Sequence, residues 1–278
     1  MKLKTILINL DRNPERLKFM SKQLKEQGIE FERLQAIDGR SYVFSKVYDE
    51  SLCIKKNGHP MTNGEKGCAL SHINAYEEFL NSNSDYLLVL EDDIELPLDF
   101  FRVLDEVISN RDSGKESWEY LTFNYPAVGT IRLKLWMFSI YRIFVNGNKL
   151  MFFLNVPIFL IKFFILSIFS FFEKIRERIY VRIFRFGKPA LFFRPLYLAG
   201  AYLVTRNGAK KLLNASQRSI IYPADRLPNI ARVRNGLKFY AFVPLLVRQR
   251  RDLFESTLAQ TNDFLAFKRA FGKSINDV

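Results

Sequence analysis

The amino-acid sequence predicts an α/β fold, and three observations lead to that prediction. The chain opens with a strand–helix–strand pattern, a later apolar strand ends in three successive carboxylates, and a basic, Phe-rich segment interrupts the middle. With 278 residues, the chain is long enough to bury a full hydrophobic core. Its content of 48% apolar and 26% charged residues is ordinary for a globular protein and excludes a disordered or collagen-like chain.

The start of the chain predicts a βαβ unit. Residues 3–10 are a short apolar run that ends at a polar turn, as buried strands do. From Pro14 to about Gln27 the apolar residues recur at spacings of three and four, which predicts a helix, and Gly28 ends it. Residues 29–37 then form a second strand. A βαβ unit of this kind is Rossmann-type and implies a parallel sheet that binds ligands at its carboxyl edge.

The later elements continue the alternation of helices and strands. A continuous apolar run of strand length is typical of a strand that is buried in the sheet. The pattern predicts helices over 64–80 and 207–214, strands over 86–90, 120–125, 196–205 and 238–247, and an irregular tail over about 255–278.

Net charge separates the middle of the chain from its flanks. The chain carries 42 Lys and Arg against 29 acidic residues, a formal net charge of +13. Eleven of the basic residues, only two of the acidic ones and 15 aromatic side chains lie in residues 129–188. Because the basic character belongs to this one Phe-rich segment, the charge argues against a nucleic-acid-binding protein whose fold is basic throughout, and we expect no nucleic-acid partner. We expect a helical insertion over 129–190 between the two halves of one domain, 1–128 and 191–278.

The insertion contains a strongly apolar segment. Residues 150–172 hold a single charged side chain, Lys162, and have the length of a membrane-spanning helix. In residues 173–188 an apolar stripe alternates with basic side chains, which is the pattern of a helix that lies on anionic lipid. One complete span would separate the two flanks, so an in-plane or re-entrant arrangement is favoured. The alternative is a helical lid packed on the protein or in a dimer interface.

The carboxylates of Glu91, Asp92 and Asp93 directly follow the strand over 86–90. Like charges at contact distance raise one another's pKa, and a divalent cation between them removes that cost. Oxygen ligands suit Mg²⁺ or Mn²⁺, which keep positions open for phosphate oxygens. Strand alternation places Glu91 and Asp93 on one side and Asp92 on the other, so Glu91 and Asp93 are the candidate metal ligands. A solvated acidic turn is the alternative.

Five motifs together identify a family resemblance. They are Asn9-Leu10-Asp11-Arg12 with Arg16, Ala36-Ile37-Asp38-Gly39, the block GEKGCALSH over 64–72, LEDD over 90–93, and Gly200-Ala201-Tyr202 with Gly208-Ala209. Over about 1–125 and 195–250 the chain resembles glycosyltransferase family 25, which includes the lipooligosaccharide β-galactosyltransferases of Gram-negative bacteria. The GEKGCALSH block joined to LEDD is specific, whereas either piece alone is weak.

The resemblance implies a GT-A-type nucleotide-sugar fold and an inverting reaction. It implies UDP-galactose or UDP-glucose as the donor and a divalent metal, Mn²⁺ in preference to Mg²⁺, at the acidic motif. Residues 1–128 would then be the donor-binding half of the domain and residues 191–278 the acceptor-side half. On the acceptor side, Gly200 and Tyr202 match the family motif. The donor-binding positions that match are Asn9, Asp11, Arg12, Arg16, Asp38, Gly39, Glu65, Ser71 and His72.

The chemistry of these residue types agrees with such roles but leaves alternatives open. Cationic side chains just past the first strand suit a diphosphate, and the alternative for Arg12 and Arg16 is a solvated helix start. Asp11 and Asp38 suit ribose hydroxyls or the uracil N–H, and the alternative is a cap or turn aspartate. His72 is otherwise a packed helix residue. A neighbouring cysteine, Cys68, is interpreted as a small packed residue and not as a nucleophile.

An inverting transfer needs a base that takes the proton of the acceptor hydroxyl. Asp225, which follows a proline turn in the second flank, is the candidate. Asp92 or Glu65 could be the base instead, and Asp225 would then be a structural turn aspartate.

Together with the residue chemistry, the family resemblance implies a transferase that moves a hexose, with galactose as the favoured one, from a UDP-hexose to a saccharide acceptor of lipooligosaccharide core or a related surface glycan. Two rivals belong to other classes. A metal-dependent nucleotidyl- or phosphotransferase would use the same acidic motif, but the sequence has neither a G-x-x-x-x-G-K-[ST] nor a G-x-G-x-x-G loop. A non-catalytic membrane-associated scaffold would use the motif only as a turn.

Two features predict the compartment. Two cysteines are too few for a disulfide framework, and the start of the chain does not have the pattern of a signal peptide. We therefore expect a cytoplasmic protein. The basic, apolar segment over about 150–188 predicts peripheral association with the anionic inner-membrane surface, next to a lipid-linked oligosaccharide acceptor.

Overall fold

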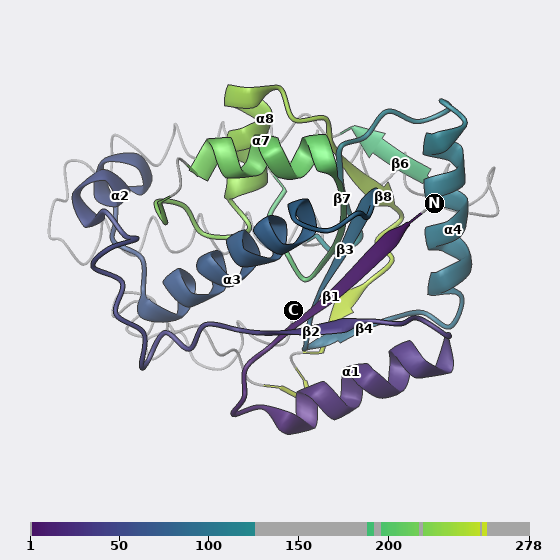
Figure 1. Cartoon of the computed structure of the whole chain (residues 1–278), viewed down its shortest axis with the longest axis horizontal. Coiled ribbons are helices and arrows are strands. Elements are labelled where there is room, and N and C mark those ends of the chain that lie inside the picture. Colours follow the sequence, from purple (N-terminus) through teal and green to yellow (C-terminus); the bar gives the residue numbers. More distant parts are fainter. Residues whose placement is uncertain (1, 126–187, 192–195, 217–218, 251, 255–278) are drawn as a thin grey trace, which may run out of the picture. The chain divides into compact units, whose positions relative to one another are not determined.

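The computed structural model describes residues 2–125, 188–191, 196–216, 219–250 and 252–254. These residues belong to one compact unit of the chain, formed by 1–125 and 187–259. Its centre is a seven-stranded sheet with the strand order β2-β1-β3-β7-β5-β8-β6 (Figure 1). The strands are β1 (Leu3–Asn9), β2 (Glu32–Gln35), β3 (Tyr86–Glu91), β5 (Tyr120–Thr122), β6 (Lys188–Leu191), β7 (Ala201–Thr205) and β8 (Phe239–Val243).

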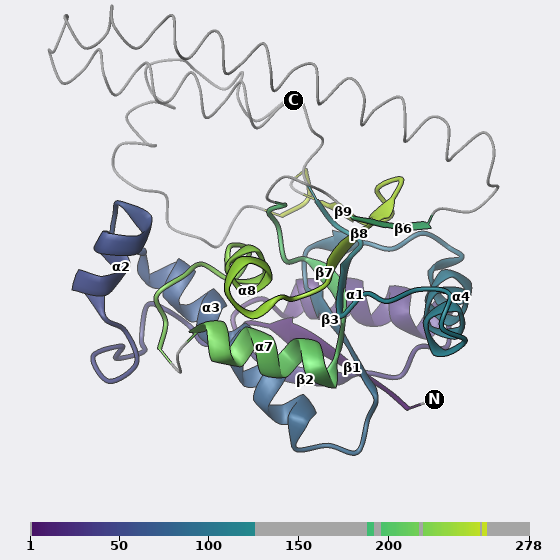
Figure 2. The same cartoon turned by 90° about the horizontal axis from the view of Figure 1, so that it is seen from above.

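Helices cover both faces of this sheet. In Figure 1, α1 and α4 lie on one side of the strands, and α3 and α7 lie on the other; Figure 2 gives the view from above. The helices are α1 (Pro14–Glu26), α2 (Glu50–Asn57), α3 (Asn63–Leu80), α4 (Phe100–Asp112), α7 (Arg206–Ser216) and α8 (Leu227–Asn235). The described part of the chain has no helix with the length and apolar character that a membrane crossing requires.

The sheet is mixed, which corrects the expectation of a parallel sheet. Strands β1, β2 and β3 are parallel, as the βαβ pattern predicts, and β5 and β8 are parallel to each other. Strand β7 is antiparallel to both of its neighbours, β3 and β5, and β6 is antiparallel to β8. The physical reason is the entry point of β7: Ala201 pairs with Leu90, so the strand starts at the carboxyl end of β3 and runs back along it.

Alternation along β3 assigns its side chains to the two faces. Leu88 and Leu90 pack in one hydrophobic cluster with Met20 of α1 and Phe100 of α4. The residues between them point to the opposite face, because successive side chains of a strand alternate. Glu91, the last residue of β3, therefore faces the side of α3, and the next residue faces the side of α1. This alternation separates the carboxylates of the acidic motif.

A second, two-stranded sheet forms beside the acidic motif. Strands β4 (Ile94–Glu95) and β9 (Arg248–Gln249) pair antiparallel, with Ile94 opposite Gln249. This pairing places the side chain of Gln249, on β9, next to Glu91 at the carboxyl end of β3. No sequence pattern indicated this sheet.

Several bounds differ from those that the sequence predicts. Strand β2 is shorter than the predicted 29–37, and β7 and β8 are shorter than 196–205 and 238–247. The expected insertion over 129–190, including the apolar segment 150–172, lies outside the described residues except for its last residues, which belong to β6.

Gly208 allows α7 to lie against the sheet, and this gives a first prediction. A Cβ at this position would lie 2.4 Å from the carbonyl oxygen of Glu119 and 2.9 Å from Val204 Cγ2. Alanine is the better helix former by about 0.5–1 kcal/mol, but a clash with backbone costs about 1–3 kcal/mol. We therefore expect Gly208→Ala to lower the free energy of unfolding in a urea titration, and Lys210→Ala, at an exposed position of the same helix, to change it by less than about 0.5 kcal/mol. Stabilisation by Gly208→Ala would contradict this packing.

Candidate functional site

A cavity of about 610 Å³ opens at the carboxyl edge of β1, β2 and β3. It lies where the βαβ pattern predicts a ligand site, because the loops after three parallel strands meet there with the first half of α3 and the chain around residue 224. Most of the expected site residues line it: Arg12, Arg16, Asp38, Gly39, Glu65, Ser71, His72, Glu91, Asp92, Asp93 and Asp225. Four expected residues, Asn9, Asp11, Gly200 and Tyr202, do not belong to the lining.

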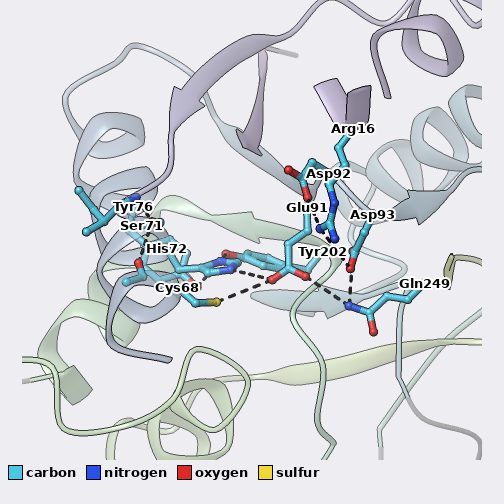
Figure 3. A network of polar contacts seen from close by, with 12 residues as sticks. Arg16, Cys68, Ser71, His72, Tyr76, Glu91, Asp92, Asp93, Tyr202 and Gln249 are labelled. Atoms are coloured by element: carbon cyan, nitrogen blue, oxygen red, sulfur yellow. Dashed lines mark hydrogen bonds and ion pairs between the residues drawn. The ribbon is translucent and has the colours of Figure 1, made fainter. Parts of the chain in front are cut away.

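Glu91 has a different environment at each of its two carboxylate oxygens (Figure 3). Oε1 lies 3.2 Å from His72 Nε2 and 4.0 Å from Cys68 Sγ. Oε2 accepts a long hydrogen bond from Gln249 Nε2, at 3.4 Å. The same amide nitrogen lies 3.5 Å from Asp93 Oδ1, so the carboxylates of Glu91 and Asp93 face one small space.

Asp92 points to the other side, toward α1. Asn9 Nδ2 donates to Asp92 Oδ2 at 2.7 Å, and Arg16 Nη1 donates to Asp92 Oδ1 at 3.2 Å. Asp92 and Arg16 are both buried, with 8% and 5% of their surface exposed. Burial raises the pKa of Asp92, whereas the hydrogen bond from Asn9 and the charge of Arg16 lower it. Arg16 is therefore the counter-charge of a buried carboxylate and not part of a solvated helix start.

The rim of the cavity carries a second group of charges. Arg12 forms an ion pair with Asp38, and Arg40 forms another with the same carboxylate. The hydrogen bonds from Arg40 and Arg12 hold the pKa of Asp38 below its usual range. Asp11 lies apart from this group, because its carboxylate accepts hydrogen bonds from Arg33 and Gln35. The structure thus brings Arg12 and Asp38 together and leaves Asp11 on the outside.

The start of α3 is fixed by its sequence. Thr62 and Glu65 form a reciprocal capping box, with Glu65 Oε2 accepting from the Thr62 backbone at 2.7 Å. Gly39 permits a close approach, since a Cβ there would lie 2.0 Å from the Asn63 carbonyl oxygen. Ser71 Oγ accepts from the backbone N–H of Ile37 at 2.8 Å. Glu65, Gly39 and Ser71 line the cavity, and these contacts hold α3 against the loop after β2.

Asp225 lines the cavity from the second flank. Burial raises its pKa, and so do the charges of Glu91 and Glu65, whereas a hydrogen bond from the backbone of Leu198 lowers it. Leu198 also lines the cavity and has a positive φ of 80°, a strained conformation for a side chain of this size. Two flanks that are far apart in the sequence therefore supply carboxylates to one cavity.

Gly200 and Tyr202 do not belong to the cavity lining. Gly200 packs against Ile94, whose Cγ2 would lie 3.1 Å from an added Cβ. Tyr202 is fully buried, and its hydroxyl contacts His72 Nδ1 at 2.7 Å and Tyr76 Oη at 2.9 Å. The structure connects Tyr202 to Glu91 through His72 and does not place it on the cavity lining.

Gln249, Tyr76 and Cys68 contribute contacts to this site, although none of them was assigned to it from the sequence. Gln249 bridges Glu91 and Asp93 but carries no local signal, since more than 150 residues separate it from them. Tyr76 ends the hydrogen-bonded chain from His72. Cys68 is one helical turn before His72, and this spacing of four is a signal that both side chains share one helix face.

Two sets of donors in the described residues could hold a metal ion. Glu91 and Asp93 offer oxygen atoms around the Gln249 amide, and such hard donors fit Mg²⁺ or Mn²⁺. Cys68, His72 and Glu91 offer one sulfur, one nitrogen and one oxygen atom within 4.8 Å of one another. The Glu91 carboxylate belongs to both sets.

Comparisons with known proteins point to one family. The model of glycosyltransferase family 25, described as an LPS biosynthesis protein family, matches residues 2–227. A glycosyltransferase 25 family member of Anopheles gambiae is 39% identical over 102 residues, which cover 34% of this chain and 17% of the relative. Human procollagen galactosyltransferase 2 is 31% identical over 123 residues, 41% of this chain and 19% of the relative.

A further relative shows that likeness to this family does not by itself establish turnover. The mouse protein named inactive glycosyltransferase 25 family member 3 is 30% identical over 121 residues, 41% of this chain and 20% of the relative. In each of these three comparisons the chain matches a fifth or less of the relative's length.

Proposed function

This chain belongs to glycosyltransferase family 25. From that premise we propose that it transfers a hexose, with galactose as the favoured one, from a UDP-sugar to a saccharide acceptor with inversion of the anomeric configuration. The relatives named galactosyltransferases support the choice of galactose. The family description as an LPS biosynthesis protein supports an acceptor of lipooligosaccharide core or a related surface glycan. The fold we propose is GT-A-like, with the parallel β2-β1-β3 segment as the donor-binding half.

The observation that carries this proposal is the cavity in which carboxylates and arginines meet. Its volume of about 610 Å³ lies within the usual range of small-molecule sites, about 300–1,000 Å³. Arg12 lies at the rim, where its guanidinium can donate two parallel hydrogen bonds to a diphosphate. Asp38 lies beside it and can accept a hydrogen bond from a ribose hydroxyl or the uracil N–H.

A divalent metal, Mn²⁺ in preference to Mg²⁺, fits the oxygen donors of Glu91 and Asp93. The chemistry it would supply there is neutralisation of the charge that develops on the departing diphosphate. The two side chains hold that position, and Gln249 keeps both carboxylates turned toward the same space.

Asp225 is the base that we propose for the acceptor hydroxyl. The other two carboxylates considered have structural partners: Asn9 and Arg16 bind Asp92, and Glu65 accepts from the Thr62 backbone in the cap of α3. Asp225 accepts a hydrogen bond from the backbone of Leu198 and lines the cavity from the second flank. The raised pKa of Asp225 suits a group that must both take and release a proton.

The proposal is tested by UDP release from a panel of UDP-sugars. With Mn²⁺ and a saccharide acceptor we expect release from UDP-galactose, and we expect EDTA to abolish it. A product analysis must show a new glycosidic bond of the inverted configuration. Metal-dependent release of a nucleoside monophosphate would favour a nucleotidyl- or phosphotransferase. A protein that neither binds nor turns over any UDP-sugar would be a scaffold.

Asp225→Asn gives a second prediction. The amide cannot accept the hydroxyl proton, so we expect kcat of transfer to fall by about 10²–10⁴-fold. Binding of UDP-galactose, measured by calorimetry, should change by less than about threefold, because the proposed role is on the acceptor. Asp105→Asn, at an exposed position of α4, is the matched control and should leave both quantities unchanged. Full transfer by Asp225→Asn would remove this assignment.

The third prediction concerns the segment over about 150–188, which lies outside the described residues. We propose that it binds anionic membrane lipid next to a lipid-linked acceptor, at the cytoplasmic side of the inner membrane. We expect the full chain to sediment with phosphatidylglycerol vesicles at low salt and less at high salt. Each basic side chain near such a surface contributes about 1 kcal/mol, so replacing Lys174, Arg178, Arg182 and Arg185 by Ser should lower the partition coefficient about 100-fold or more. Equal binding to neutral vesicles would contradict the electrostatic part.

A further inference from the structure

We propose that Cys68, His72 and Glu91 form a binding site for a thiophilic divalent transition metal, with Zn²⁺ as the natural candidate. Cys68 and His72 are one turn apart on α3, and Glu91 ends β3 opposite them (Figure 3). Their three ligand atoms lie within 4.8 Å of one another. This site is distinct in donor chemistry from the oxygen pair of Glu91 and Asp93.

The distances fit a tetrahedral centre after small adjustments. Zn²⁺ binds sulfur at about 2.3 Å and nitrogen or oxygen at about 2.0–2.2 Å, so ligand atoms of one tetrahedron lie roughly 3.3–3.6 Å apart. His72 Nε2 and Glu91 Oε1 are already 3.2 Å apart, and Cys68 Sγ is 4.0 Å from the same oxygen. Because the three atoms lie within 4.8 Å of one another, the Cys68 sulfur would have to move closer to the other two ligand atoms when the ion binds. Three protein ligands leave a fourth position open toward the cavity.

The hydrogen bonds behind His72 orient it as a ligand. The Tyr202 hydroxyl lies 2.9 Å from Tyr76 Oη and 2.7 Å from His72 Nδ1, so it can accept from Nδ1–H while it donates to Tyr76. In the metal-bound form that we propose, Nδ1 carries the ring proton and the lone pair of Nε2 binds the ion. Nε2 and Glu91 Oε1 lie 3.2 Å apart, close enough for one ion to bind both atoms, and a second hydrogen-bonded partner on the other ring nitrogen is the usual arrangement of a metal-ligating histidine.

The thiol of Cys68 loses its proton when the metal binds. Burial and the charge of Glu91 raise its pKa in the protein alone, and a coordinated thiol is deprotonated by the ion. The step balances as one divalent ion bound and one proton released to solvent. Glu91 uses Oε1 here and turns Oε2 toward Gln249 and Asp93. The inference rests on these contacts and not on the proposed transfer.

Co²⁺ is the probe that tests the site, because thiolate coordination to Co²⁺ gives a charge-transfer absorption in the near ultraviolet. We expect one equivalent of Co²⁺ to produce this absorption in the reduced full chain, with release of one proton. Zn²⁺ added afterwards should abolish it, since Zn²⁺ generally displaces Co²⁺ from such sites. Tyr202→Phe should weaken the affinity by about 10–100-fold, as loss of an outer-shell partner does.

The chain provides a matched control because it has only two cysteines. We expect Cys68→Ser to lose the absorption, and Cys53→Ser, which changes the buried cysteine of α2, to keep it. Asp93→Asn should keep it as well, which separates this site from the oxygen pair. An absorption that is missing in the wild-type protein, or that persists in Cys68→Ser, would overturn the proposal; the His72 Nε2–H then simply donates to Glu91. Because the readout needs no UDP-sugar, it stays valid if the proposed transfer fails.

Discussion

Asp93→Ala is expected to lower metal-dependent UDP release by about 100-fold or more. Asp93 supplies one of the two carboxylates that face the space around the Gln249 amide. Metal-assisted stabilisation of a developing anion contributes several kcal/mol, and each ~1.36 kcal/mol corresponds to a factor of ten in rate. A loss of about 3 kcal/mol therefore gives the stated factor. We expect the apparent dissociation constant for Mn²⁺ to rise at the same time.

The measurement is a coupled assay of UDP release at several Mn²⁺ concentrations. Asp93 is a sharper choice than Glu91 for this test, because Glu91 also contacts His72. Asp105→Ala changes an exposed carboxylate of α4 and is the control, with turnover expected to stay within about twofold. If Asp93→Ala keeps the wild-type rate and the wild-type Mn²⁺ dependence, the acidic motif does not hold the ion, and our assignment of this edge of the sheet is wrong.

Arg16→Met is expected to destabilise the fold by about 3–5 kcal/mol, the typical cost of removing one partner from a buried ion pair. Arg16 and Asp92 are 5% and 8% exposed, and Arg16 Nη1 lies 3.2 Å from Asp92 Oδ1. Methionine keeps much of the side-chain volume but leaves the carboxylate without this charge. Urea titrations followed by circular dichroism measure the difference in the free energy of unfolding.

Two companion variants isolate the charge. Arg102→Met removes an arginine that pairs with Asp99 on the exposed surface of α4, and such pairs contribute about 0–1 kcal/mol. The double variant Arg16→Met/Asp92→Asn removes both charges and should recover a large part of the loss. A loss under about 1 kcal/mol for Arg16→Met would show that solvent reaches the pair.

The penalty of Arg16→Met should also depend on pH. Burial raises the pKa of Asp92 above that of the unfolded chain, and without Arg16 it rises further. A carboxyl group whose pKa is higher in the folded than in the unfolded state stabilises the fold while it is protonated. This stabilisation is complete below the pKa of the unfolded chain and is lost as the pH rises through the pKa of the folded state. The variant should therefore lose less stability near about pH 5 than near about pH 7.5. The same penalty at both values would contradict a buried, unpaired carboxylate.

The elements that the sequence predicted well are those with a strong local pattern. The alternation from β1 through α1 and the apolar run of β3 are visible in the residues themselves, because burial on a fixed face imposes a period. Helix α4 was not predicted, although Phe100, Val103, Leu104 and Val107 recur along it at helical spacing. Strands β4 and β9 are two residues each and have no period to detect.

The sequence also pointed to residues that lie close together in the structure, while their roles stay predictions. Eleven of the expected residues line one cavity, since the ends of adjacent parallel strands meet at one edge. Strand alternation also placed Asp92 on the opposite side from Glu91 and Asp93, as the structure shows, but it could not name their partners: Asp92 contacts Arg16 and Asn9, whereas Glu91 contacts His72. The roles of Gln249 and Tyr202 arise only from the pairing of β9 with β4 and of β7 with β3.

By itself, the sequence determined the α/β class, the acidic end of a buried strand and the family resemblance, because these depend on residues close together along the chain. Tertiary structure alone decided that β7 runs antiparallel between β3 and β5, that Asp225 reaches the cavity, and that one carboxylate serves two donor sets. The physical reason is range: local periodicity follows from backbone geometry, whereas contacts across more than a hundred residues depend on how the whole sheet closes its core.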